Sequence, residues 1–121
     1  MKKAIIITFC VILTLASAGI IIHKSMLDGL DGFVWSRFLQ EDTVFSPGYS
    51  DNAFKQITIG MPEAEVKRLL GEPFEIYPPD EFSNRKKLCY SLSPGDTNYR
   101  IRAINIQEGC VISKHSEFYL D

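Results

Sequence analysis

The chain begins with a long apolar run and continues with a polar part in which apolar residues recur at short intervals. Residues 4–22 read AIIITFCVILTLASAGIII and contain no charged side chain. A helix over these residues would be roughly 28 Å long, close to the hydrocarbon thickness of a bilayer, and would pair its backbone polar groups internally. The pattern predicts a membrane anchor within residues 1–24 that contacts lipid through residues 4–22.

A cleavable signal peptide is the alternative interpretation of this segment. Lys2-Lys3 would be its basic region and Ala16-Ser17-Ala18 its cleavage site. Cleavage after Ala18 would leave Gly19 and three isoleucines at the start of the mature chain, where polar residues are usual, so the uncleaved anchor is favoured. Cys10 lies in the middle of the apolar run and not at its end, which argues against lipid modification of this cysteine.

The charges beside the segment predict its orientation. Lys2 and Lys3 precede it, whereas His23 and Lys24 follow it. Because basic residues near a span favour the cytoplasmic side, we expect a single-pass protein with a cytoplasmic N-terminus and an extracytoplasmic, periplasmic C-terminal domain. Cleavage after Ala18 would instead release that domain into the periplasm.

Residues 25–49 are expected to form a juxtamembrane helical stem. Its apolar residues recur at helical spacing: Leu27, Leu30, Val34 and Phe38. Gly29 and Gly32 interrupt this stripe, and each weakens the helix by about 1 kcal/mol. Packing of the stem on the domain is favoured, and the alternative is an interfacial amphipathic segment with Trp35 near the lipid headgroups. The turn residues of Thr43 to Asn52 predict a loop that ends the stem.

The remaining residues, 50–121, are expected to form one small domain, and its clearest element is a helix. Pro62 suits the first helical position, Gly71 can adopt the left-handed conformation that closes a helix, and Pro73 prevents continuation. We expect nine or ten helical residues that bury Val66, Leu69 and Leu70. A shorter helix, capped by Ser50 or Asp51, is expected to precede it and to bury Phe54 and Ile57.

Three β-like runs follow, at Lys87 to Ser93, Asn98 to Gln107 and Cys110 to Tyr119. The two-residue turn Glu108-Gly109 predicts a hairpin that pairs Gln107 with Cys110, Ile106 with Val111 and Ile104 with Ser113. The expected fold class is α+β: an N-terminal transmembrane or signal helix, then a two-layer domain of short helices on a three-stranded antiparallel β-meander. Met61, Ile104 and Ile106 complete the expected core.

Charge and composition exclude several functional classes. Lys2 and Lys3 are two of the 13 basic residues, so residues 23–121 carry 11 basic against 15 acidic residues, a formal charge of about −4. This balance argues against nucleic acid as a partner. The three cysteines form no CxxC motif and the two histidines lie far apart, so we expect no metal and no cofactor.

The order of a short helix, an I-x-x-G-M-P helix ending in L-G-x-P, and a β-meander resembles the SmpA/OmlA (BamE-like) family of outer-membrane assembly lipoproteins. The resemblance covers residues 50–115 and is carried by Phe54, Ile57, Ile59-Gly60-Met61-Pro62, Glu65-Val66, Leu69-Leu70-Gly71-Glu72-Pro73, Tyr90, Ile104, Ile106 and Gly109-Cys110-Val111-Ile112. The same small unit is similar to each half of the β-lactamase-inhibitor protein fold. Gly60, Met61, Pro62, Val66, Leu69, Leu70, Gly71 and Pro73 form the structural motif.

This resemblance implies a non-catalytic domain of the bacterial cell envelope that binds protein partners, and it suggests a link to outer-membrane protein assembly. The chain departs from the family in having no lipid-modification cysteine, and an uncleaved anchor would hold it at the inner membrane. The alternative function is a periplasmic sensor or inhibitor that binds a small ligand or an extracellular enzyme. An exposed aromatic patch would favour partner binding, and a closed apolar cavity would favour a ligand.

Residues capable of catalysis are sparse, and we expect no enzyme activity. His115 and Glu117 could share a strand face with a Cys89 nucleophile, but exposed strand residues of these types are usually solvated. Glu63 and Glu65 are expected to interact with the helix dipole. Arg85-Lys86-Lys87 could attract anionic lipid or an acidic partner, although a solvated edge is the favoured interpretation. A disulfide between Cys89 and Cys110 is an open alternative. The simplest strand register opposes it, because it places Cys89 opposite Arg102, on the other sheet face from Cys110.

Overall fold

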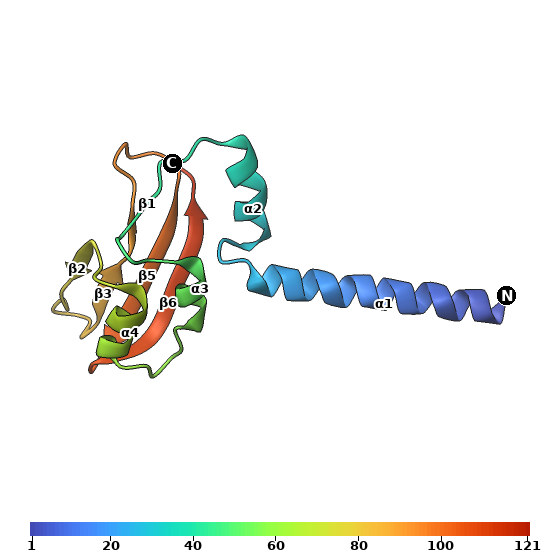
Figure 1. Ribbon diagram of the computed structural model, residues 1–121, viewed down its shortest axis with the longest axis horizontal. Helices are drawn as coiled ribbons and strands as arrows, with labels where there is room; N and C mark the ends of the chain where they lie inside the picture. Colours follow the sequence, from blue (N-terminus) through green and yellow to red (C-terminus); the bar gives the residue numbers. More distant parts are fainter.

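The computed structural model has a long N-terminal helix followed by a small α+β domain (Figure 1). It describes the backbone of residues 1–121 and the side chains of residues 1–22 and 26–121. Helix α1, Lys2–Ser25, extends away from the domain, and its side chains are exposed through Ile22. Residues Lys2–Ile22 have a mean hydropathy of 2.8, so this helix is long and apolar enough to be a membrane span or a signal sequence.

Four antiparallel strands form the main sheet, in the order β2-β3-β5-β6. They are β2 (Glu75–Tyr77), β3 (Lys86–Cys89), β5 (Tyr99–Gln107) and β6 (Cys110–Tyr119). The expected three-stranded meander is therefore wrong by one strand. Residues 75–77 are too few to show a strand by periodicity alone, and they extend because β3 supplies hydrogen-bonding partners along their length.

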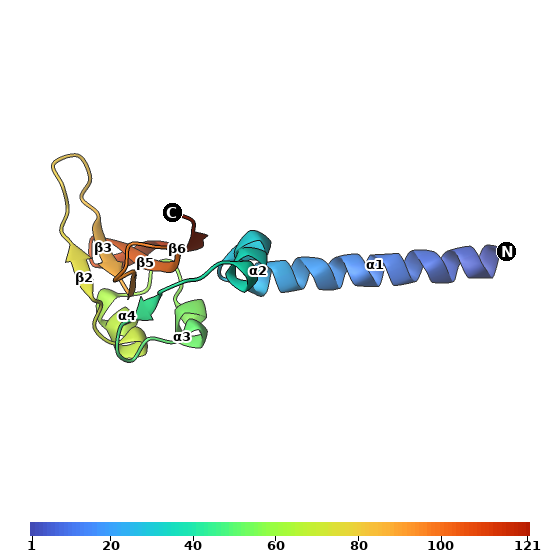
Figure 2. The ribbon, with the colours of Figure 1, turned by 90° about the horizontal axis from the view of Figure 1, so that it is seen from above.

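Two short helices cover one face of this sheet (Figure 2). Helix α3, Asp51–Gln56, starts at Ser50, whose hydroxyl accepts a hydrogen bond from the amide of Ala53 at 3.2 Å. Helix α4, Glu63–Leu70, confirms the predicted second helix, although Pro62 occupies the extended cap position and not the first helical one. The helix has eight residues instead of nine or ten.

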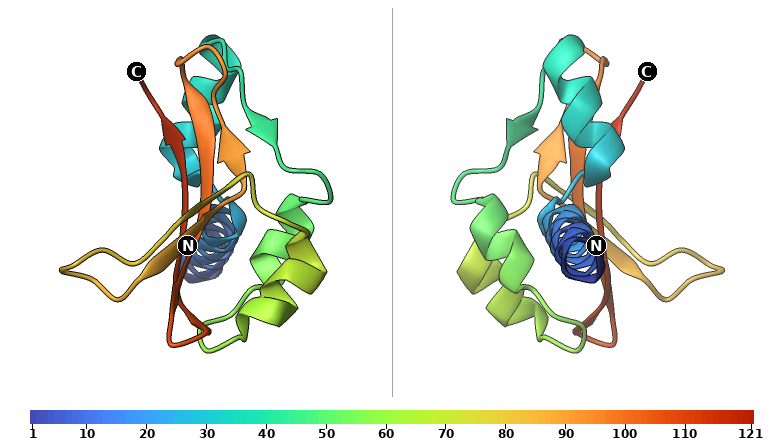
Figure 3. Two further views of the ribbon diagram at one scale, coloured as in Figure 1. Left: turned by 90° about the vertical axis from the view of Figure 1, so that its left-hand side faces the viewer. Right: turned by 90° about the vertical axis from the view of Figure 1, so that its right-hand side faces the viewer.

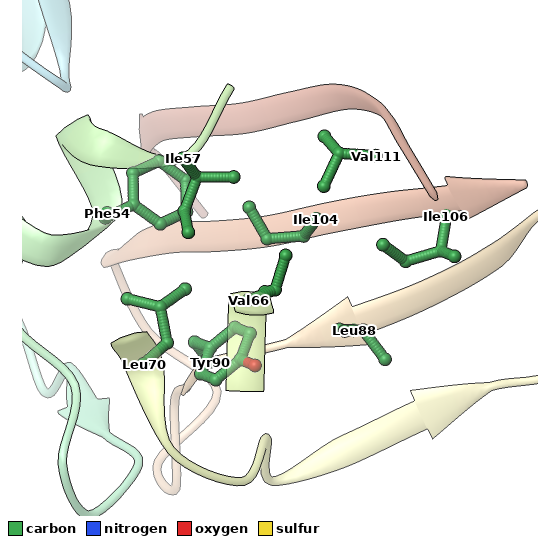
Figure 4. Packing of buried hydrophobic residues seen from close by; sticks show 9 residues of the cluster. All are labelled: Phe54, Ile57, Val66, Leu70, Leu88, Tyr90, Ile104, Ile106 and Val111. Atoms are coloured by element: carbon green, nitrogen blue, oxygen red, sulfur yellow. The ribbon is translucent and has the colours of Figure 1, made fainter. Parts of the chain in front are cut away.

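The core lies between these helices and the sheet (Figure 4). Its side chains converge from both layers, and each is at most 2% exposed. The cluster consists of Phe54, Ile57, Val66, Leu70, Leu88, Tyr90, Ile104, Ile106 and Val111. Met61 and Leu69 pack against it but are only partly buried, so they form its margin.

The predicted strand from Lys87 to Ser93 is interrupted at Tyr90. Its end forms β4, Ser91–Leu92, which pairs with β1, Val44–Phe45, in a separate two-stranded sheet. The segment expected to be a loop after the stem therefore contains a strand. The interruption also moves the register, because Cys89 lies opposite Ala103 and not opposite Arg102. A one-residue shift moves a side chain to the other sheet face.

The hairpin between β5 and β6 follows the predicted turn but contains a bulge. Gln107 faces Cys110 and Ile106 faces Val111, as predicted. The register then shifts at Asn105/Ile106, so that Ile104 faces Lys114 and not Ser113. A bulge adds one residue to one strand and so changes the pairing on one side of it only.

Helix α2, Gly29–Phe38, is the stem, and it lies beside β6 (Figure 1). Its buried residue is Gly32. A side chain at this position would clash, because an added Cβ would lie 2.5 Å from the Cβ of Asp28 and 2.9 Å from the Cβ of Phe118. Gly32 thus weakens the helix but allows close packing on the domain.

Gly71 ends α4 with φ 76° and ψ −166°, a backbone conformation restricted to glycine. An added Cβ would also lie 2.8 Å from the carbonyl oxygen of Pro47. We expect Gly71→Val to lower the free energy of unfolding by at least about 1–3 kcal/mol, the usual range for backbone strain. Chemical denaturation of the full chain in detergent micelles measures this loss.

Gly109→Ala is the matched control, because Gly109 also has positive φ (78°) but no atom lies within 4 Å of an added Cβ. The loss caused by Gly71→Val should exceed the loss at this control. Equal losses would contradict the close approach of Pro47 to Gly71.

Candidate functional site

The sheet face opposite α3 and α4 is covered by neither of these helices (Figure 3). Strand alternation assigns its residues, because Cys89 lies opposite Ala103, which lies opposite His115. A hollow of about 270 Å³ lies on this face. The side chains and backbone that line it include Glu75, Tyr77, Lys87, Cys89, Asp96, Tyr99, Ile101, Ala103 and His115.

The β2–β3 hairpin projects on the same side of the sheet, away from the two helices (Figures 2 and 3). Its connecting residues are 78–85, and Phe82 among them is 97% exposed. The Asp80 Oδ1 atom accepts hydrogen bonds from the amides of Phe82, at 2.9 Å, and Ser83, at 2.5 Å. These bonds define a turn around Asp80, and Phe82 projects from it into solvent.

Aromatic and charged groups alternate across this surface. Lys87 Nζ lies 5.9 Å from the centre of the Tyr77 ring, and the rings of Tyr99 and Tyr119 lie 5.7 Å apart. Tyr77 and Tyr119 are exposed. We call the open sheet face together with the β2–β3 hairpin the open surface. Aromatic side chains of this kind are typical of protein interfaces.

The expected nucleophilic group does not come together on this surface. His115 Nε2 lies 3.1 Å from Glu117 Oε1, so these two residues do pair. Cys89, however, lies on the other side of Ala103, which places it two strands and roughly 10 Å from His115. Burial also raises the pKa of Cys89, which disfavours the thiolate that a nucleophile requires.

The remaining charged candidates have partners of their own. Glu63 pairs with Lys67 at 3.7 Å and with Lys86 at 2.6 Å. Glu65 pairs with Arg68, and this hydrogen-bonded pair lowers the pKa of Glu65. The two carboxylates therefore point to different cations and form no catalytic pair. Among the described side chains, no group of three histidine, cysteine, aspartate or glutamate residues could hold a metal ion.

Cys89 and Cys110 are free thiols, and the structure corrects the possible disulfide. Both occupy the open face, but Cys89 lies opposite Ala103 whereas Cys110 lies opposite Gln107. Four residues of strand separate these partners, about 13 Å along the sheet. A disulfide requires Cα atoms closer than about 7 Å, so this fold does not allow the bridge.

A buried ion pair joins the stem to the domain, and no local sequence pattern indicated it. Arg102, whose side chain is fully buried, contacts both carboxylate oxygens of Asp28 at 2.6 and 3.0 Å. Arg102 Nε also contacts Asp51 at 3.3 Å, at the start of α3. Arg100 adds a contact to Asp28 at 3.1 Å and holds Glu41 at 3.0 Å. We call these five residues the junction network.

The protonation of the junction network follows its contacts. Burial alone would lower the pKa of Arg102, but hydrogen bonding and charge attraction from Asp28 outweigh burial and raise it. Burial would likewise raise the pKa of Glu41, but hydrogen bonds from Arg100 and Thr43 outweigh burial and lower it. These shifts favour the charged forms of Arg102 and Glu41, whose contacts are charge-assisted hydrogen bonds.

We expect Asp28→Asn to destabilise the fold, because it leaves the buried Arg102 guanidinium without its main counter-charge. The expected loss in the free energy of unfolding is about 3–5 kcal/mol, the usual cost of breaking a buried pair. Urea denaturation followed by circular dichroism measures it. Glu65→Gln, which breaks an exposed pair, is the control and should cause no measurable loss. Equal effects of the two variants would show that Asp28 does not anchor the stem.

The three cysteines provide a separate test of strand register. We expect protein isolated under oxidising conditions to take up three alkyl groups per chain after unfolding, with or without a reductant, because Cys10, Cys89 and Cys110 are all free. Intact-mass spectrometry counts the groups. Uptake of one group without reductant and three with it would show a Cys89–Cys110 bridge and contradict the register.

Comparison with known proteins does not identify a family for this chain. No family model, curated protein or solved structure matches the chain. The function is therefore argued from the open surface, the junction network and the apolar helix.

Proposed function

We propose that this protein is a membrane-anchored, extracytoplasmic interaction domain of the bacterial cell envelope, with no chemistry of its own. Helix α1 would be the uncleaved single-pass anchor, with its N-terminus in the cytoplasm. The domain would bind an envelope protein through the open surface and serve as an adaptor or scaffold. The observation that carries this proposal is the exposed Phe82 in the connecting turn of a projecting hairpin.

The arrangement of the domain along α1 supports this role. The sheet order from β6 to β2 runs away from α1, so the β2–β3 hairpin lies at the end of the domain farthest from that helix (Figures 1 and 2). If α1 spans a bilayer, Phe82 is held away from the membrane surface. A partner in the periplasm could then reach the open surface without contacting lipid.

The chemistry of the hollows favours a protein partner over a small apolar ligand. The hollow on the open face is lined by charged and aromatic groups, among them Glu75, Lys87 and Tyr99. A second hollow, of about 450 Å³, lies beside α2 and is lined by Asp28, Arg100 and other charged groups. Small-molecule sites are usually enclosed and mostly apolar, with few polar groups.

A role in outer-membrane protein assembly is the narrower form of the proposal. It rests on the resemblance of residues 50–115 to the SmpA/OmlA family, in particular on the Gly60-Met61-Pro62 and Leu70-Gly71-Glu72-Pro73 segments. In the structure, these segments flank α4 and shape the domain core. The open surface supports partner binding in general and does not depend on this narrower role.

We expect a photo-crosslinking phenylalanine analogue in place of Phe82 to form a specific adduct in intact cells. The analogue preserves an aromatic side chain, and Phe82 is so exposed that the replacement should leave thermal unfolding unchanged. The adduct should weaken several-fold when Tyr77, on the adjoining strand, is changed to Ala. Denaturing gel electrophoresis and mass spectrometry detect and identify the adduct.

The same analogue in place of Arg68 is the matched control, because Arg68 is exposed on α4 in the opposite layer of the domain. Its position should give no adduct with the protein that Phe82 captures. Equal capture at both positions, or no change on Tyr77→Ala, would contradict binding through the open surface.

A further inference from the structure

Helix α2 carries an apolar stripe that the domain does not cover. Leu30, Val34 and Phe38 follow one another at steps of four residues and are 55%, 42% and 79% exposed. Residues spaced by four lie on one helix face. Of the stripe expected from the sequence, these three residues lie on α2 and do not pack on the domain, whereas Leu27 precedes the helix and packs against the core.

The opposite side of α2 faces the domain with small residues. Gly32 is buried and Ser36 is half-buried. At 100° per residue, Gly32 and Ser36 lie on the far side of the helix from Val34. The exposed stripe is therefore the result of how α2 is oriented, because the close contact at Gly32 fixes which face turns outward.

The direction of α2 relative to α1 indicates what covers this stripe. Helix α2 runs across the axis of α1, between α1 and the sheet (Figures 1 and 2). Viewed from the N-terminal side, α2 lies in front of the sheet (Figure 3, right). If α1 crosses a bilayer along the membrane normal, α2 lies parallel to the membrane surface. Its outward face then turns toward the lipid.

We propose that α2 is an interfacial helix whose Leu30-Val34-Phe38 stripe inserts into the outer boundary of the bilayer that α1 spans. Trp35 and Phe33, both about half exposed, flank the stripe. Tryptophan prefers the headgroup region, and an amphipathic helix lies in this region with its apolar face buried. Membrane lipid is the occupant that we infer for this surface.

Charge beside α2 is consistent with a headgroup environment. The Arg37 guanidinium lies 5.1 Å from the centre of the Phe33 ring, at the edge of the stripe. Arg37, Lys55 and Arg100 line the 450 Å³ hollow between α2 and α3, together with Asp28 and Asp51. The junction network sets two arginines against the three carboxylates of Asp28, Asp51 and Glu41, so it leaves one negative charge uncompensated. Arg37 and Lys55 are the two cations of this hollow outside that network, and they are the groups that would face lipid phosphates.

Continuity with α1 favours lipid over a second copy of the chain or another protein. The last turn of α1 and the first turn of α2 are separated by only Met26, Leu27 and Asp28. Leu27 is also tied to the domain, because its carbonyl oxygen accepts a hydrogen bond from the Ser116 hydroxyl at 2.7 Å. So short a connection leaves the stripe next to the membrane whenever α1 is inserted.

Fluorescence of Trp35, the single tryptophan of the chain, tests the proposal directly. The full chain is reconstituted in phosphatidylcholine–phosphatidylglycerol vesicles, with or without brominated acyl chains. We expect a blue-shifted Trp35 emission that lipid bromine near the glycerol end of the chain quenches strongly and aqueous iodide quenches weakly. Resistance of the protein to alkaline extraction confirms that α1 is inserted, independently of any partner of the open surface.

The variant Leu30→Ser/Val34→Ser/Phe38→Ser should reduce lipid quenching several-fold and increase iodide quenching, while the protein remains resistant to extraction. Phe82→Ser is the control, since it removes an exposed apolar side chain far from α1 and should change neither signal. Trp35 that iodide quenches freely in the unchanged chain would overturn the proposal. Equal lipid quenching in the triple variant would overturn it too. Weak lipid quenching that rises when the protein is diluted within the bilayer would overturn it as well, and would assign the stripe to a second copy.

Discussion

The fold depends on a single buried cation. Arg102 lies at the centre of the longest strand pair, on the face where the core residues Ile104 and Ile106 continue the same strand. A buried guanidinium is tolerated only when counter-charges and hydrogen-bond acceptors surround it. Asp28 from the stem and Asp51 from α3 supply both. The domain is thus completed by a residue of the stem, and detachment of the stem would leave the Arg102 guanidinium without its main counter-charge.

Local sequence signals predicted the elements that depend on local chemistry. The Ser50 cap, the helix closed by Gly71 and the Glu108-Gly109 turn all appear where the residues indicated them. Signals that depend on distant partners were missed. Strand β2 exists because β3 pairs with it, and the bulge at Asn105/Ile106 depends on both strands of the hairpin. The Asp28–Arg102 pair joins residues 74 positions apart, and nothing in either local sequence shows it.

The open surface, too, could not be predicted from local sequence signals. The hairpin loop has the polar composition of an ordinary connection, so only the exposure and the hydrogen-bonded turn around Phe82 mark it as a surface of interest. The basic residues that the sequence singled out divide in the structure. Lys86 pairs with Glu63 at 2.6 Å, whereas Lys87 lies over Tyr77 and belongs to the open surface. Composition identified the charges, but strand alternation decides which of them a partner could contact.

Gly32 links the position of α2 to the position of the open surface. Because this residue has no side chain, α2 can approach β6 closely, and Asp28 can reach Arg102. The same contact turns Val34 away from the domain. Strand β6, which α2 contacts, is the strand of the main sheet nearest α1, and β2 is the strand farthest from it. A larger residue at position 32 would rotate or displace α2. It would thereby change the exposed stripe, the buried ion pair and the placement of Phe82 relative to α1. The apparent weakness of a glycine within a helix is therefore the condition that fixes the orientation of the whole domain.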